Sequence, residues 1–382
     1  MKFSTTIRIF LVCAMLASAG TIPLLAQSPG DRDKPKLIEF DPPGAATENS
    51  VFCVPLCGTL AYANNSLGEV TGFFTDANVV PHGFLRSPEG KFTVFDAPGS
   101  GQGYFLDQGT VPYSINDAGV ITGQFEDSSQ SFHGFIRYRD GSFITFDVPN
   151  AVGTVPWDIN LEGTTAGIYF DANGFHGFVR SPSGKTTEFD PTGSVYTYVC
   201  EETCLNEGGS IAGFYSDANG LTHGFLRHPD GKITVIDVTG AANGTYPASI
   251  NNEGTIGGYY VDSTATCYGF IRKADGKIST FSLSGAGTGN FDGTVPYSIN
   301  DGDTVTGVIY DSIGSMHAFS RSLWGKVARF KAPDGGTGSN QGTRPSTNNR
   351  EGAVAGWYVD ANNLNHGFVW IPGEDCSGDD DE

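Results

Sequence analysis

The stretch "SFHGFIRYRDGSFITFD" (residues 131–147) contains two short runs of aromatic and β-branched residues joined by an Asp-Gly turn. Such runs are typical of β-strands, and Asp-Gly supplies the positive φ that a tight hairpin needs. The stretch therefore predicts two antiparallel strands. Similar stretches recur along most of the chain, so the fold has to be derived from a repeat.

The His-Gly-Phe tripeptide marks each copy of this repeat. Copies follow one another at intervals of 43 to 51 residues and begin at His82, His133, His176, His223, Tyr268, His317 and His366. Most copies carry four strand-like segments, such as TVPYSIN, VITGQFED, SFHGFIR and FITFDVP in the second copy. Four antiparallel strands in a unit of about 45 residues are typical of a β-propeller blade.

The two ends of the repeat region complement each other. The seventh copy stops after "HGFVWIPG" (residues 366–373) without a fourth strand, and "KLIEFDPPG" (residues 36–44) resembles the fourth strand "KFTVFDAPG" (residues 91–99). We therefore predict an all-β, seven-bladed β-propeller over residues 36–373, with four antiparallel strands per blade and a ring closed by the N-terminal strand. This pairing covers an open sheet edge. A β-solenoid, the alternative, has no use for a displaced strand.

Recurring apolar positions are expected to pack between blades, because one blade cannot bury both of its faces. We expect the Gly of His-Gly-Phe to let a neighbouring blade approach closely. The outer strands repeat one further packing position, occupied by Phe40, Phe95, Phe146, Phe189, Ile236, Phe281 and Phe330.

The units "INDAGVITGQFED…HGFIR", "LNEGGSIAGFYSD…HGFLR" and "INNEGTIGGYYVD…YGFIR" resemble the HAF family of bacterial extracellular repeats. The resemblance covers nearly all of the chain after the first residues. It implies an exported bacterial protein with a propeller-like fold. It implies no catalytic pattern, so no functional residue is transferred from the family to this sequence.

The first 26 residues are predicted to be a signal peptide. Lys2 and Arg8 precede the apolar run "IFLVCAMLASA" (residues 9–19), and cleavage could follow Ala19 or Ala26. The run is too short to span a bilayer, which disfavours the alternative of a membrane anchor. Residues 27–35 are expected to be an exposed segment, and residues 374–382 an acidic tail. The predicted location is extracellular or periplasmic.

Charge restricts the partners that can be expected. The formal net charge is −20, so the surface would repel the phosphates of nucleic acid. No segment after the signal is long and apolar enough to cross a membrane. We expect a secreted monomer whose partner is an extracellular glycan or protein.

Six cysteines follow the signal, and an exported chain with an even number favours disulfides. Close spacing predicts the local pairs Cys53–Cys57 and Cys200–Cys204. The partners of Cys267 and Cys376 stay open. A shared zinc site is the alternative for the two close pairs, but they belong to opposite sides of the expected ring, and structural zinc needs four ligands in one tetrahedron. We therefore predict no metal site there.

Each copy places an acidic residue five or six positions before the His, namely Asp76, Asp127, Asp171, Asp217, Asp262, Asp311 and Asp360. An Asp near a His suggests a charge relay or a metal site. We favour a structural role, in which the carboxylate accepts backbone N–H bonds of a turn and the His donates to it. "FDANGFHGF" and "SDANGLTHGF" also resemble parts of calcium loops without their later acidic ligands, so calcium is an alternative to plain turn geometry.

One inner-strand position departs from the sevenfold pattern. It holds aromatic residues in four copies and Thr203, Ala248 and Ser346 in the others; the aromatic ones are Tyr62, Tyr113, Trp157 and Tyr297. These four rings are our candidate ligand-binding residues, because aromatic faces can stack on sugars. The alternative is that they pack between blades, since aromatic burial dominates core energetics.

The loops between outer and inner strands also differ in length, from the long stretches 41–59 and 96–110 to the short stretch 147–154. We expect a ligand on the face that carries them. No nucleophile elbow, phosphate loop or zinc-protease motif is present. A binding or scaffold propeller is therefore the first hypothesis. An extracellular lyase or hydrolase acting over the central channel is the second, and a purely structural envelope protein the third.

Overall fold

The computed structural model describes residues 34–48, 57–103, 108–199 and 203–373. The proposed signal peptide, most of the segment 27–35 and the acidic tail lie outside these residues. Every regular element within them is a strand. The strands are β1 (Lys36–Phe40), β2 (Thr59–Asn64), β3 (Val70–Thr75), β4 (Pro81–Arg86), β5 (Phe92–Phe95), β6 (Gly109–Ile115), β7 (Ile121–Glu126), β8 (Phe132–Arg137), β9 (Phe143–Phe146), β10 (Gly153–Ile159), β11 (Thr165–Asp171), β12 (Gly174–Arg180), β13 (Thr186–Phe189), β14 (Ser194–Val199), β15 (Ile211–Asp217), β16 (Thr222–Arg227), β17 (Ile233–Ile236), β18 (Thr245–Ile250), β19 (Ile256–Val261), β20 (Cys267–Arg272), β21 (Ile278–Phe281), β22 (Gly293–Ile299), β23 (Val305–Tyr310), β24 (Met316–Arg321), β25 (Val327–Phe330), β26 (Gly342–Asn348), β27 (Val354–Val359) and β28 (Asn365–Ile371).

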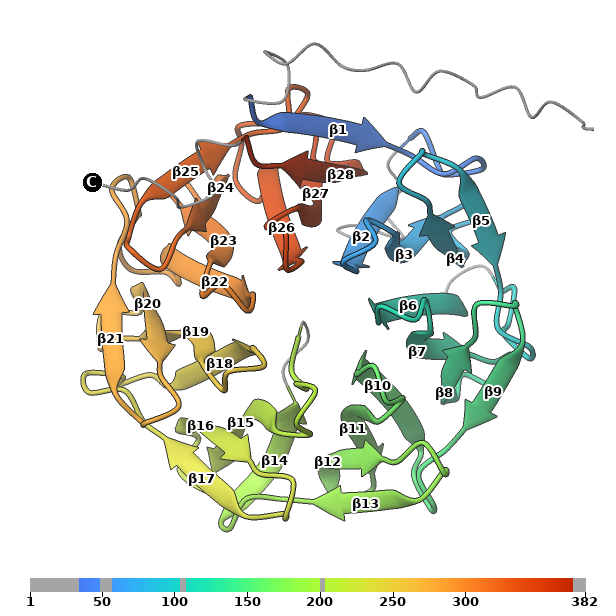
Figure 1. Cartoon of the computed structure of the whole chain (residues 1–382), viewed down its shortest axis with the longest axis horizontal. Helices are drawn as coiled ribbons and strands as arrows, with labels where there is room; N and C mark the ends of the chain where they lie inside the picture. The colour runs from blue at the N-terminus through green and yellow to red at the C-terminus, as the bar shows by residue number, and fades with distance from the viewer. Residues whose placement is uncertain (1–33, 49–56, 104–107, 200–202, 374–382) are drawn as a thin grey trace, which may run out of the picture.

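These strands form a β-propeller. They pair antiparallel in groups of four, as in β2-β3-β4-β5 and β14-β15-β16-β17, and single parallel bridges join some neighbouring groups. Figure 1 shows the groups arranged around a common centre, with strands such as β2, β6 and β10 innermost and β5, β9 and β13 outermost. None of the described residues forms a helix that could cross a membrane.

The His-Gly-Phe tripeptide supplies the core of each group. Its Phe is fully buried in all copies, at Phe84, Phe135, Phe178, Phe225, Phe270, Phe319 and Phe368. Its Gly makes room mainly for the outer strand of its own group: a Cβ on Gly134 would lie 2.8 Å from the Phe146 ring. A Cβ on Gly83 would meet both Phe95 of its own outer strand and Pro112 of the next group. The expected close approach of a neighbouring blade therefore explains only part of the need for Gly.

The repeated Arg at the end of the third strand links adjacent groups. The Arg137 guanidinium lies 4.7 Å from the centre of the Phe95 ring, and Phe95 belongs to the preceding group. The same cation–π contact recurs between Arg180 and Phe146 and between Arg227 and Phe189. The outer-strand aromatic residues are thus contacts between groups as well as within them.

The N-terminal strand pairs where the sequence predicts. Strand β1 is antiparallel to β28, with Lys36 opposite Ile371 and Phe40 opposite Gly367. The Phe40 ring lies 5.9 Å from the Phe84 ring of β4, and the Arg86 guanidinium lies 4.9 Å from its centre. The strand therefore extends the last group and also contacts the first.

Asparagines at the ends of the inner strands connect neighbouring groups. Each donates from its side-chain amide to the backbone carbonyl of the corresponding Asn in the next group, at 2.8–3.5 Å. The bonds run Asn65→Asn116→Asn160→Asn206→Asn251→Asn300→Asn349→Asn65. The side-chain oxygen of Asn116 also accepts N–H bonds from its own turn, at Ala118 and Val120. The same Asn side chain thus stabilises its own turn and binds the next group.

Candidate functional site

Most of the repeated His residues lie between two Asp carboxylates of their own group. In the first group, His82 Nδ1 lies 2.9 Å from Asp96, which follows the outer strand, and Nε2 lies 3.8 Å from Asp76. Asp76 accepts backbone N–H bonds from Asn78 and Val80, as expected for a turn. The pairing with the second carboxylate recurs at His133–Asp147, His176–Asp190, His223–Asp237 and His366–Asp41.

Sequence reasoning did not identify this second Asp, although it follows Phe in several outer strands. One feature of the sequence pointed to this pairing. In the fifth copy both partners are replaced: Ser282 stands at the position of that Asp and Tyr268 at the position of the His. The His ring also stacks on an aromatic ring of the second strand, as His133 does on Phe125 at 5.0 Å. Because the same contacts recur on separate groups, they favour a role in the fold.

Three of the four predicted inner-strand aromatic residues contact one another. The Tyr62 ring centre lies 5.3 Å from that of Tyr113, and Tyr113 lies 4.2 Å from Trp157. All three pack on the core cluster. The indole Nε1–H of Trp157 is buried and has no hydrogen-bond partner within the described ranges. Packing is therefore observed, and ligand binding by these three residues stays a prediction.

The fourth predicted residue, Tyr297, lies at a cavity of about 490 Å³. The cavity is lined from three consecutive groups. Tyr259 and Cys267 come from β19 and β20. Tyr297 and Tyr310 come from β22 and β23. The turn and loop residues are Asn290, Phe291, Asp292, Ser312, Ile313, Gly314, Ser339 and Asn340. We call this the Tyr297 cavity.

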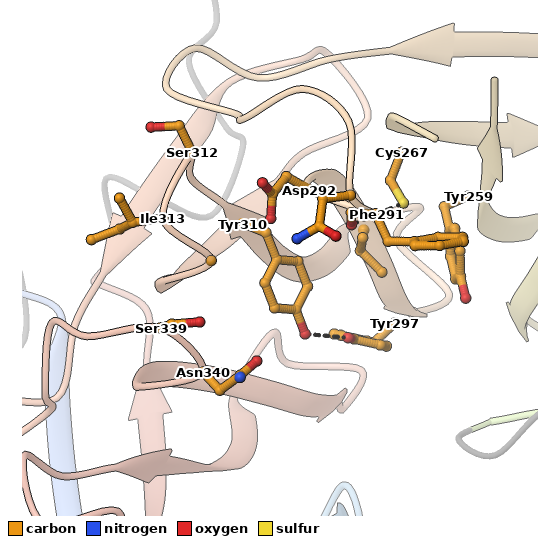
Figure 2. A pocket seen from close by; sticks show the side chains of 13 residues that line it. Tyr259, Cys267, Phe291, Asp292, Tyr297, Tyr310, Ser312, Ile313, Ser339 and Asn340 are labelled. Carbon is orange, nitrogen blue, oxygen red and sulfur yellow. Dashed lines mark hydrogen bonds between the residues drawn. The ribbon is translucent and has the colours of Figure 1, made fainter. Parts of the chain in front are cut away.

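Figure 2 shows how these side chains are arranged. Tyr310 lies in the middle of the lining, and its hydroxyl meets that of Tyr297 at 3.0 Å. Asp292 lies beside Tyr310, whereas Ser339 and Asn340 come from the loop that leads into β26. The cavity therefore combines hydroxyl, carboxyl and amide groups with aromatic rings.

Two residues at the rim are exposed and apolar. Phe291 is 61% exposed and Ile313 is 62% exposed. Phe291 has a φ of 64° and the preceding Asn290 a φ of 54°. A bulky residue with positive φ is a genuine outlier, and such strain clusters at functional sites. The backbone carbonyl of Phe291 accepts a hydrogen bond from the Cys267 thiol at 3.2 Å, which helps to hold this conformation.

Three ionisable groups of the Tyr297 cavity have pKa values shifted upwards. Burial raises the pKa of the Cys267 thiol to about 12, and the nearby Asp292 carboxylate adds to the shift. Burial also raises the pKa of Tyr297 well above its ordinary value. The pKa of Asp292 is raised by burial and by the charge of Asp311. A thiol shifted in this direction is a poor nucleophile.

The remaining sequence predictions fall partly outside the described residues. Cys53 and Cys200 lie outside them, so the pairs Cys53–Cys57 and Cys200–Cys204 stay predictions; Cys57 and Cys204 are buried. Parts of the long loops, residues 49–56 and 104–107, are outside as well.

The calcium alternative also stays open. In both Asp-Asn turns the carboxylates are bonded within the turn, as Asp171 is to the backbone N–H of Asn173. Within the described ranges, no group of three or more His, Cys, Asp or Glu residues is arranged to hold a metal ion.

Comparisons with known proteins place the fold only. No protein-family model matches this chain, and no curated protein sequence matches it. Among solved structures, virginiamycin B lyase from Staphylococcus aureus is similar with a TM-score of 0.57 and 12% identity, over 88% of this chain and 99% of that one. A streptogramin B lyase is similar with a TM-score of 0.53 and 13% identity, over 88% and 97% of the two chains.

The β-propeller domain of the trilobed protease from Pyrococcus furiosus is also similar. Its TM-score is 0.53 at 11% identity, over 84% of this chain and 98% of that domain, which is described as having an open velcro topology. Identities this low support the shared β-propeller architecture and transfer no activity.

Proposed function

We propose that this chain is an exported, HAF-like, seven-bladed β-propeller that binds a glycan, with a sugar ring seated in the Tyr297 cavity. The extracellular space or the periplasm is its location in this proposal. The observation that carries the proposal is the exposed Phe291 ring, which a backbone of positive φ holds at the rim of a cavity lined by hydroxyl, carboxyl and amide groups.

A closed ring of seven blades is supported by contacts between the first and last groups. Besides the β1–β28 pairing, Asn349 donates to Asn65 at 3.0 Å and Ser346 donates to the carbonyl of Ala61 at 2.9 Å. The Asn349–Asn65 bond is of the same kind as the bonds that connect the other adjacent groups. A rigid ring is a suitable support, because a binding site must hold its side chains in place.

The chemistry of the Tyr297 cavity suits an uncharged sugar. A sugar ring has an apolar face, which can cover an aromatic ring such as Phe291, and a rim of hydroxyls that need hydrogen-bond partners. Asp292, Asn340 and Ser312 offer such partners within one cavity. An anionic ligand is disfavoured there, since Asp292 and the neighbouring Asp311 repel it.

Binding is better supported than catalysis. A nucleophilic mechanism needs a thiol or hydroxyl activated by a base. The Cys267 thiol is shifted the other way, and no His lines the cavity within the described part of the chain.

A lyase or hydrolase is the second candidate, and Asp292 is the observation that favours it. Its raised pKa keeps the carboxyl protonated to higher pH, which a general acid requires.

A panel of neutral and acidic polysaccharides, tested for binding by calorimetry and for turnover by product analysis, separates these functions. The proposal expects binding of a neutral glycan without turnover, and Phe291→Asn should weaken it. Val152→Asn is the matched control, since Val152 is 62% exposed in a loop of the same type and lies outside the cavity. Turnover abolished by Asp292→Asn would favour the enzyme, and absence of any binding would refute the proposal.

A further inference from the structure

A second cavity, of about 530 Å³, lies on the opposite face of the propeller. It is formed by the β24–β25 turn, the β26–β27 turn and the end of β28, and its lining includes Ser322, Trp324, Lys326, Arg350 and Glu351. The β23–β24 turn of the Tyr297 cavity lies at the other end of β24, because a strand runs from one face to the other. We call this second site the Trp324 cavity.

Trp324 breaks the pattern of the repeat. The corresponding turn position in the other groups holds a polar residue: Glu89, Asp140, Ser183, Asp230 or Asp275. Trp324 is 81% exposed, and the neighbouring Leu323 is also exposed. The turn itself does not require an aromatic residue, because five turns of the same shape form without one. Exposed apolar surface of this kind marks an interaction site.

The charges around Trp324 differ from those of the rest of the molecule. Asp and Glu outnumber Lys and Arg by 42 to 22 in the sequence, yet two cations, Lys326 and Arg350, line this cavity against one carboxylate, Glu351. The guanidinium fork of Arg350 matches a carboxylate in a bidentate geometry. The lining therefore offers an anion a guanidinium partner, Arg350, on a chain whose formal net charge is negative.

A hydroxyl is also available for a ligand. The Oγ atom of Ser322 is buried, and within the described ranges it has no hydrogen-bond partner. A buried polar atom without a partner carries a cost that a ligand group can remove. Ser322 lies two residues from Trp324 and lines the same cavity.

We propose that the Trp324 cavity binds an acidic sugar unit, a uronate, independently of the Tyr297 cavity. The apolar face of the pyranose covers the indole of Trp324, the carboxylate pairs with Arg350, and a ring hydroxyl bonds Ser322. Sites on opposite faces give one molecule the means to bridge two polysaccharide chains.

Titration with a uronate oligomer and with an uncharged hexose oligomer of equal length tests this, using galacturonate, glucuronate and mannuronate in turn. We expect one uronate to bind at least tenfold more tightly than its uncharged counterpart. Raising the salt concentration should weaken binding of the uronate oligomer and leave binding of the uncharged oligomer unchanged, because only the carboxylate contact is screened.

Two variants use residues that the repeat already tolerates. Trp324→Asp introduces the residue found at Asp140, and should lower uronate affinity at least tenfold. Arg350→Asn introduces the residue found at Asn252, and should remove the preference for the charged oligomer. Glu89→Ala, at the same turn position in the first group, is the control and should change nothing. Equal binding of charged and uncharged oligomers, no uronate binding, or unchanged binding by Trp324→Asp would each overturn the proposal.

Discussion

Replacing Phe291 by Asn separates the stability of the propeller from its ligand binding. Asn tolerates positive φ far better than Phe does, so the change should relieve about 1 kcal/mol of backbone strain at the 64° φ of this residue. The lost packing is similar in size. Full burial of Phe is worth about 2.5 kcal/mol, and the ring is 61% exposed, so about 1 kcal/mol is lost. The free energy of unfolding should therefore stay within about 1 kcal/mol.

The expected loss of affinity follows from the area that the ring offers. A Phe side chain has roughly 200 Å² of surface, of which 61% is exposed, and a sugar that covers half of that area buries roughly 60 Å². At about 25 cal/mol per Å² this is about 1.5 kcal/mol, or roughly tenfold in Kd.

Calorimetric titration with the glycan found in the panel and urea unfolding measure the two quantities on the same variant. The matched Val152→Asn variant should change neither. Affinity of the Phe291→Asn variant within twofold of the unmodified protein would refute the role of the ring. A destabilisation beyond about 2 kcal/mol would show that the strain argument is wrong, because packing would then outweigh backbone relief.

Three further predictions concern the ring and the ends of the chain. A chain beginning at residue 43 should melt well below one beginning at residue 34, because it lacks β1 and its contacts; equal melting temperatures would show that β1 adds no stability. The hydrogen bond to Asp41 raises the pKa of His366, so this pair adds stability that is present below pH 6.5 and is lost as pH rises through the raised value. Asp41→Asn should flatten this part of the profile of unfolding free energy against pH, and an unaltered profile would contradict it. Non-reducing peptide mapping should find the local disulfides Cys53–Cys57 and Cys200–Cys204. Free thiols at these four positions would exclude them.

Local patterns in the sequence were enough to predict the propeller architecture. Alternating strands, Gly turns and the His-Gly-Phe tripeptide recur because each group needs the same hairpins and the same buried Phe, so one group explains the others. The displaced strand at residues 36–44 could be assigned to its partner because it lacked a neighbour and β28 lacked a fourth strand. These features depend on residues close in sequence or on exact repetition.

The candidate site could be predicted only in part. Tyr297 was identified because it departs from the sevenfold pattern. The cavity beside it also needs Cys267 and Asn340, which are far apart in the sequence and carry no shared motif. The second carboxylate that pairs with most of the repeat His residues was missed for a similar reason, since Asp96 follows His82 by 14 residues and meets it only when the outer strand folds back.

The sequence by itself determined the strands and their order, because short apolar runs and turn chemistry act over a few residues and recur in every copy. Tertiary structure alone decided which residues from distant strands and irregular loops meet at one place. The Asn349–Asn65 bond and the meeting of Cys267, Asp292 and Asn340 at one cavity depend on how whole groups stack and how irregular loops bend between them. Irregular loops follow no period, so no local signal records where their side chains converge.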